Sequence, residues 1–236
     1  MATTYLQAIN RVLEKIGEEQ VPAAATSITE TYELLVGSFV QDIKEEIEDA
    51  HNWRALRQTN TSTIAANTNS VAITEANERS RVVRILQQDR GEIIPLVFDI
   101  TDSTNPDPLT EIDLAELLYR DTVDPDNRND PLYFALDNTS GDVLELYVWP
   151  RPSSERTIQH TLVIPQPRFE PSDLSEIIKI PIRPLIVGAT WYALEERGEE
   201  LGASGLFNEK RFRDSLDAAI SRDSDGQGDS IELVRT

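Results

Sequence analysis

Apolar residues near the start of the chain recur at the three- and four-residue spacing of an amphipathic helix. The first such stripe runs over Tyr5–Ile16, with a capping box of Thr4 and Gln7 before it and Gly17 after it. A second stripe, behind the capping-box pattern of 27–30, predicts one long helix over 28–53, about 40 Å in length. Its opposite face is expected to be acidic and solvated, through Glu33, Asp42, Glu45, Glu46, Glu48 and Asp49.

The apolar pattern changes at about Thr59 to the alternation typical of strands. The segment 137–141 predicts a hairpin turn, and the polar insertion 101–131 is expected to hold one short helix over 111–119, capped within 110–113. Alternation in 157–164 places Ile158, His160, Leu162 and Ile164 on one core-facing side. The predicted strands are 70–74, 81–87, 93–97, 132–136, 143–149 and 157–164.

Helical spacing returns after Pro167. One helix is predicted over 181–197, ending at Gly198, and a second begins at about Leu206 and stops at the polar run 223–229. The second helix is expected to bury Phe207, Phe212, Leu216, Ala219 and Ile220.

The elements come in blocks rather than in alternation, which argues against a doubly wound sheet. We predict an α+β fold: a helical bundle of N- and C-terminal helices with an inserted, mainly antiparallel β domain and an extended C-terminal tail. The expected domains are the N-terminal helices (1–58), the β-rich domain (59–170, with the insertion 101–131), the C-terminal helices (171–222) and the tail (223–236).

Charge and composition exclude several classes of protein. The 236 residues include 22 Lys and Arg against 42 Asp and Glu, a net charge of −20, which argues against electrostatic gripping of nucleic acid. The hydrophobic share of 39% is enough for a core. Cysteine is absent, so disulfides, thiolate zinc sites and cysteine nucleophiles are excluded. With no signal-peptide pattern and no apolar stretch of about 20 residues, we expect a protein that stays in the cytosol, or in something assembled there, and not in a membrane.

The sequence offers little evidence for a catalytic or metal-binding site. The run 223–229 starts like a calcium loop, but the twelfth position is Val234, and 124–130 places Arg128 where a ligand belongs. His51 is expected to cap or pack near the end of the long helix, and His160 to be a core imidazole. A spatial Ser-His-Asp triad stays open. We predict no enzyme, with no catalytic, cofactor-binding or metal-binding residues.

The C-terminal tail has two possible explanations. Its alternating apolar pattern behind a Gly- and Asp-rich linker is compatible with a frayed terminus. It is equally compatible with strand addition to a partner, where main-chain hydrogen bonds and alternate side chains provide the affinity.

The chain resembles the head-to-tail adaptor proteins of tailed bacteriophages, also called tail tubular protein A-like. Four segments carry the resemblance, in order: AINRVLEKIGE at 8–18 with Pro22, AHNWRALR at 50–57, YFAL at 133–136 with LYVWPRP at 146–152, and GATWYA at 188–193. The insertion 101–131 matches least.

The resemblance implies a structural virion protein at the head–tail junction, assembled in the host bacterial cytoplasm. It implies a ring, expected to have twelve subunits, that binds the portal protein, extends the DNA channel and presents a platform for the next tail component, a nozzle or stopper. Genomic DNA would pass through the acidic channel during ejection without specific binding. The implied portal-binding residues are Ser230, Ile231, Glu232, Leu233, Val234, Arg235 and Thr236.

Two alternatives stay open. One is a head-completion, stopper or tail-tube protein placed one ring further down. The other, from a different class, is an acidic metal-dependent phage hydrolase.

Overall fold

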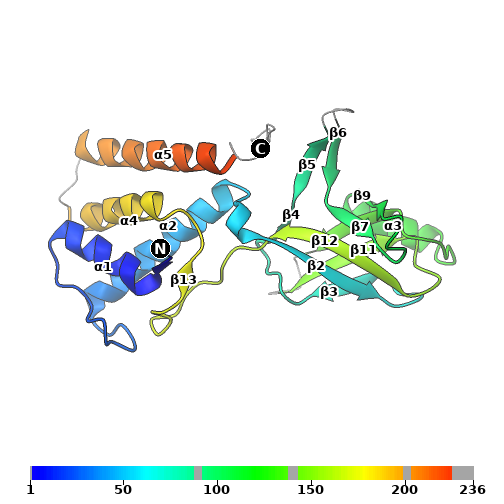
Figure 1. Ribbon diagram of the computed structural model, residues 1–236, viewed down its shortest axis with the longest axis horizontal. Helices are drawn as coiled ribbons and strands as arrows, with labels where there is room; N and C mark the ends of the chain where they lie inside the picture. Colours follow the sequence, from blue (N-terminus) through cyan, green and yellow to red (C-terminus); the bar gives the residue numbers. More distant parts are fainter. Residues whose placement is uncertain (1, 88–91, 138–142, 199–202, 225–236) are drawn as a thin grey trace. The chain divides into compact units, whose positions relative to one another are not determined.

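The computed structural model describes residues 2–87, 92–137, 143–198 and 203–224 (Figure 1). The chain divides into two compact units. The helical unit comprises Met1–Leu56 and Gln166–Gly228, and the β unit contains Arg57–Pro165. Helices and mainly antiparallel sheets occupy separate parts of the chain, which confirms the predicted α+β class.

The helical unit is built from segments of both ends of the chain (Figure 1). Helix α1 packs against α2 and α4, and α4 also packs against α2 and α5. A short antiparallel pair joins the strand before α1 to the strand before α4. The elements are β1 (Thr3–Thr4), α1 (Tyr5–Ile16), α2 (Thr31–Ala50), the 3₁₀ turn η1 (Arg54–Leu56), β13 (Ile177–Ile178), α4 (Ile182–Glu196) and α5 (Ala203–Ser224).

Helix α1 begins and ends as its sequence predicts. The Thr4 hydroxyl accepts a hydrogen bond from the backbone of Gln7, and the Gln7 side chain accepts one from the backbone of Thr4, which completes the capping box. Gly17 ends the helix with a φ of 77°, a left-handed conformation that glycine adopts without a steric penalty.

Helix α2 is shorter than predicted. It contains 20 residues, or about 30 Å, and begins at Thr31 without a side-chain cap. The predicted capping box at 27–30 is wrong: the Ser27 hydroxyl donates to the carbonyl of Ile28 instead, and the backbone NH of Ile28 donates to the carbonyl of Pro171. At the other end, His51 caps the helix, and Trp53 lies beyond it, buried, with its indole NH donating to Ile47.

A buried ion pair on α2 overturns the prediction that Glu48 lies on a solvated face. Lys44 and Glu48 are fully buried, with 3.4 Å between Nζ and Oε1. The Lys44 ammonium donates to the carbonyls of Gln166 and Pro167, and the Glu48 carboxylate accepts from the backbone NH of Gln166. The ammonium also lies 4.9 Å from the centre of the Phe169 ring. The pair therefore fixes the chain where it enters the helical unit at residue 166.

Helix α4 approaches its neighbours closely at Gly188. A Cβ added there would lie 2.8 Å from the Ile43 side chain on α2 and 3.0 Å from Phe212 on α5.

Helix α5 buries Phe212 and Ala219 as predicted, but Phe207 is 65% exposed, which corrects the predicted core. The helix also runs through Ser224, beyond the predicted start of the polar linker at 223.

The β unit contains two larger sheets (Figure 1). One has the order β3-β11-β10-β9, and the other β2-β12-β7-β8, with β4 also paired to β12. Strands β5 and β6 form a separate antiparallel pair. The strands are β2 (Arg57–Ile64), β3 (Ser70–Ile73), β4 (Arg81–Val82), β5 (Arg84–Gln87), β6 (Glu92–Pro95), β7 (Val97–Asp99), β8 (Asp107–Pro108), β9 (Thr110–Glu111), β10 (Tyr133–Asp137), β11 (Leu144–Trp149) and β12 (Arg156–Val163).

Both larger sheets contribute to one hydrophobic core. Phe134 and Leu146 come from the first sheet, and Ile158 and Leu162 from the second. The predicted β10–β11 and β12 strands are confirmed within a residue or two. The predicted strand over 81–87 is divided at Val83, whose backbone bonds Thr161 and Leu96.

Helix α3 (Leu114–Val123) lies inside the insertion 101–131, three residues later than predicted. Thr110 and Glu111, expected within its cap, instead form β9 and pair in parallel with β10. Asp113 provides the cap, because its side chain accepts from the backbone of Ala115.

We predict that Lys44→Met lowers the free energy of unfolding by about 3 kcal/mol, because the Glu48 carboxylate would stay buried without its cation. Chemical denaturation followed by the helical circular dichroism signal measures this change. The exposed Lys179→Met is the matched control and should change stability by less than about 0.5 kcal/mol. Equal effects of the two substitutions would contradict a stabilising role for the pair.

Candidate functional site: a cationic groove on the helical unit

The residues predicted to bind a portal lie outside the described part of the chain. Ser230, Ile231, Glu232, Leu233, Val234, Arg235 and Thr236 follow α5, whose last described residue is Ser224. Their assignment stays a prediction. The linker before them begins later than expected, because Asp223 belongs to α5 and its carboxylate lies 3.0 Å from His51 Nε2.

The two histidines lie in separate units and have different partners. His51 contacts Asp223 and stacks edge-on against Trp53, at 4.9 Å between ring centres. His160 lies in the core, with Nε2 2.9 Å from the Ser62 hydroxyl. Its Nδ1 has no hydrogen-bond partner within the described residues, so Ser62 and His160 form a pair without the carboxylate of a triad.

Metal ligands are not gathered in the described ranges. Within them, no group of three or more His, Asp or Glu side chains is arranged to hold a metal ion. Among the described helices, none is long and apolar enough to cross a membrane.

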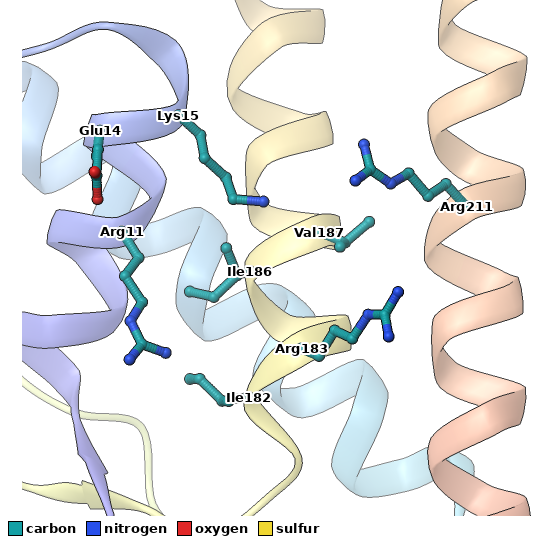
Figure 2. A pocket seen from close by; sticks show the side chains of 8 residues that line it. All are labelled: Arg11, Glu14, Lys15, Ile182, Arg183, Ile186, Val187 and Arg211. Atoms are coloured by element: carbon teal, nitrogen blue, oxygen red, sulfur yellow. The ribbon is translucent and has the colours of Figure 1, made fainter.

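The most distinctive surface of the helical unit is a groove along α1, α4 and α5, which we name the cationic groove. Its main hollow has a volume of about 670 Å³ (Figure 2). A second hollow of about 270 Å³ shares Arg183, Val187 and Arg211 with it. The residues that line the main hollow are Arg11, Glu14 and Lys15 of α1, Ile182, Arg183, Ile186 and Val187 of α4, and Arg211 of α5.

Helical spacing places these side chains together. Arg11 and Lys15 are four residues apart on the exposed face of α1, opposite its buried stripe. Arg183 points from α4 toward α5, and Arg211 points from α5 toward α4 (Figure 2). The α5 side of the second hollow continues along one helix face, through Asp214, Ser215, Ala218 and Arg222.

The groove is positive in an otherwise acidic protein. Its two hollows are lined by five cations, Arg222 included, and two carboxylates, Glu14 and Asp214, whereas the whole chain carries −20. Arg11, Lys15, Arg183 and Arg211 are exposed and form no ion pair with any described residue. Most other described arginines of this unit are bound, such as Arg168 to Asp42 and Arg197 to Glu18.

This arrangement suits an acidic ligand with apolar parts. Exposed guanidinium and ammonium groups bind carboxylates or phosphates through charge-assisted hydrogen bonds. Between them, Ile182, Ile186 and Val187 form an apolar floor, which offers phosphate or sugar nothing to bond. A polypeptide segment with carboxylates around apolar side chains satisfies both features.

The sequence carries little signal for this groove. The net charge of −20 favours an acidic surface, and the cations of the groove come from three helices that are distant in the sequence. One local signal was present: Arg11 and Lys15 share the outer face of the first predicted helix at four-residue spacing.

Burial lowers the pKa of His160, only partly offset by the charge of Glu75. The unfolded chain therefore binds the proton more readily than the folded protein does. We predict that the free energy of unfolding falls as the pH drops through about 6.5, by up to about 1.4 kcal/mol per pH unit.

His160→Gln should remove this part of the pH dependence, which denaturation curves between about pH 5 and 7.5 measure against the wild type. Ser62→Ala is the matched control, because it keeps the buried imidazole and should keep the slope. A wild-type slope in His160→Gln would show that another group causes it.

Comparison with known proteins gives a family that covers nearly the whole chain. The family model described as SU10 adaptor protein matches residues 3–231. No curated protein matches the sequence. The match supports the phage adaptor expected from the sequence, whereas the narrower resemblance to tail tubular protein A-like proteins is not confirmed. The chain belongs to the SU10 adaptor protein family.

Proposed function

We propose that this chain is a structural protein of the virion, a head-to-tail adaptor that forms a ring beneath the portal protein. The ring extends the DNA channel and carries the next tail component. Membership of an adaptor family over residues 3–231 is the observation that carries the proposal. A twelve-subunit ring is the expected size.

The charge of the chain supports this role. Copies that each carry −20 would give the channel a negative wall, and such a wall repels the phosphate backbone. DNA would then slide through without specific binding. Exposed acidic side chains without an ion-pair partner in the described residues, such as Asp107 and Glu155, are candidates for such a surface.

The division into a helical unit and a β unit supports a connecting role. Each unit has its own hydrophobic core, so each can present a separate surface to a different neighbour. The C-terminal residues 230–236 are proposed to bind the portal by strand addition.

A second position in the same assembly is a head-completion, stopper or tail-tube protein one ring further down. It predicts self-assembly or binding to the tail rather than to the portal. The hydrolase alternative has less support, because no metal-holding group occurs in the described ranges and the family is one of adaptors.

Electron microscopy of negatively stained particles tests the function. We expect that the purified chain mixed with portal rings of the same phage adds one further ring to each portal. The chain without portal is the control and should show no such ring. Tubes or rings formed by the chain alone, without portal binding, would contradict the adaptor position and favour a stopper or tail-tube protein one ring further down.

Deletion of residues 230–236 tests the tail. We expect at least a tenfold loss of portal affinity, because the alternating segment would no longer add its strand. Replacing Ile231, Leu233 and Val234 by Ser in the full-length chain should cause a similar loss, whereas Lys179→Ala, at an exposed residue outside the tail, should not. Unchanged portal binding by the deletion variant, measured by sedimentation, would show that the tail does not bind the portal.

A further inference from the structure

Helix α3 of the β unit presents an apolar stripe to solvent. Ala115, Tyr119 and Val123 are four residues apart and therefore lie along one face, about 12 Å long. Tyr119 is 69% exposed and Val123 64% exposed. The neighbouring Leu118 is also exposed. Contiguous exposed apolar side chains of this kind mark interaction sites.

The opposite face of α3 is fixed to the β unit, so the apolar stripe is held rigidly. Leu117 is fully buried there. Asp121 accepts two hydrogen bonds from the Arg151 guanidinium, at 2.6 and 2.5 Å. The Arg120 guanidinium lies 4.6 Å from the centre of the Tyr133 ring on β10. A surface held this way loses little conformational entropy on binding.

Two exposed carboxylates, Asp124 and Asp126, stand at the C-terminal end of α3. Asp124 caps the helix end, where the helix dipole already places partial negative charge. Asp126 follows two residues later, and both carboxylates are exposed without a partner among the described residues. A carboxylate at this end of a helix is unfavourable unless a cation lies nearby.

The cationic groove of the helical unit has the complementary features. Its apolar floor, Ile182, Ile186 and Val187, lies between cations that have no ion pair with a described residue. Phe207 lies one turn before Arg211 on the same side of α5 and is 65% exposed. The groove is thus an apolar strip with a positive rim. The outer face of α3 is an apolar strip with a negative end.

We propose that the cationic groove of one copy of this chain binds the outer face of α3 of the next copy. The inference rests on the proposed function as a ring. Val123 and Tyr119 would lie on the apolar floor, and Asp124 and Asp126 would meet the guanidinium and ammonium groups. Because the two surfaces are different, the contact is heterologous, and its repetition gives a ring when the rotation between neighbouring copies closes.

A second copy fits the groove better than nucleic acid does. A phosphate backbone would leave the apolar floor and Phe207 unburied, and the net charge of −20 would repel it. The same repulsion acts between copies, and opposite charges at the contact offset it locally and fix the register.

Charge reversal at both surfaces tests the contact. We compare Lys15→Glu/Arg211→Glu with Asp124→Lys/Asp126→Lys and with the four substitutions combined, in full-length protein added to portal rings. Each pair alone should raise the concentration needed for half-complete rings at least tenfold. The combined variant should restore assembly to within about threefold of the wild type, because the charges again attract.

The matched control is Lys179→Glu/Lys210→Glu, which makes the same change in net charge at exposed lysines that do not line the groove. It should change ring formation less than twofold. An equal loss in the control, or no rescue by the combined variant, would overturn the contact. If Lys15→Glu/Arg211→Glu forms normal rings, the contact is overturned and the proposed function is not. If the wild type forms no ring on the portal, the proposed function is overturned as well.

Cross-linking gives a second readout, since the chain has no natural cysteine. Phe207→Cys and Tyr119→Cys in the same chain, treated with a bismaleimide, should give a ladder that extends beyond dimers. Lys179→Cys with Tyr119→Cys is the control and should give none. Absence of a ladder in assembled rings, or binding of labelled duplex DNA that is lost in the groove variant, would contradict the assignment.

Discussion

The buried Lys44–Glu48 pair is the constraint on which the helical unit depends. Both side chains are inaccessible to solvent, and both bond the backbone at Gln166, where the chain returns from the β unit. The Gln166 side chain in turn bonds the carbonyl of Ile177 and the backbone NH of Lys179. Charges this deep are costly unless they are paired and hydrogen-bonded, so the segment that follows has one favourable position. That segment leads into α4, the helix that packs against α1, α2 and α5.

The position of α4 determines the cationic groove. Its floor is formed by α4, and its rim by cations of α1 and α5 on either side (Figure 2). The close approach at Gly188 brings α4 against Ile43 and Phe212, while Arg183 and Val187 of the same helix line the groove. A packing requirement in the core therefore places a positive surface on a protein whose net charge is −20.

Periodicity in the sequence predicted the elements whose pattern is local. The capping box of α1, the strands β10 and β11, which pair antiparallel, and the α+β class were found in this way, whereas the turn predicted at 137–141 lies mostly outside the described residues. The pattern failed where long-range contacts decide. Strand β2 was missed because it is rich in polar residues, and its pairing with β12 appears only in the fold. Glu48 matched a solvated helix face, and only the returning segment at Gln166 buries it.

The candidate site was less predictable than the fold. A groove made by three helices has no signature in one sequence, and the acidic composition pointed away from it. Phe207 was predicted to be buried because it follows the helical period, yet it lies exposed beside the groove's helix face. Together with Tyr119 and Val123, which are also exposed, Phe207 marks surfaces that the fold leaves unpartnered in the described residues.

Cryo-electron microscopy of the head–tail junction, from virions that contain this chain, tests the central claim most directly. The account predicts a closed ring of this chain between the portal and the tail, with the cationic groove of each copy filled by α3 of the next. A map that places the chain elsewhere in the particle would contradict the adaptor function. A ring in which Arg183 and Arg211 face open solvent or DNA would contradict the contact between copies.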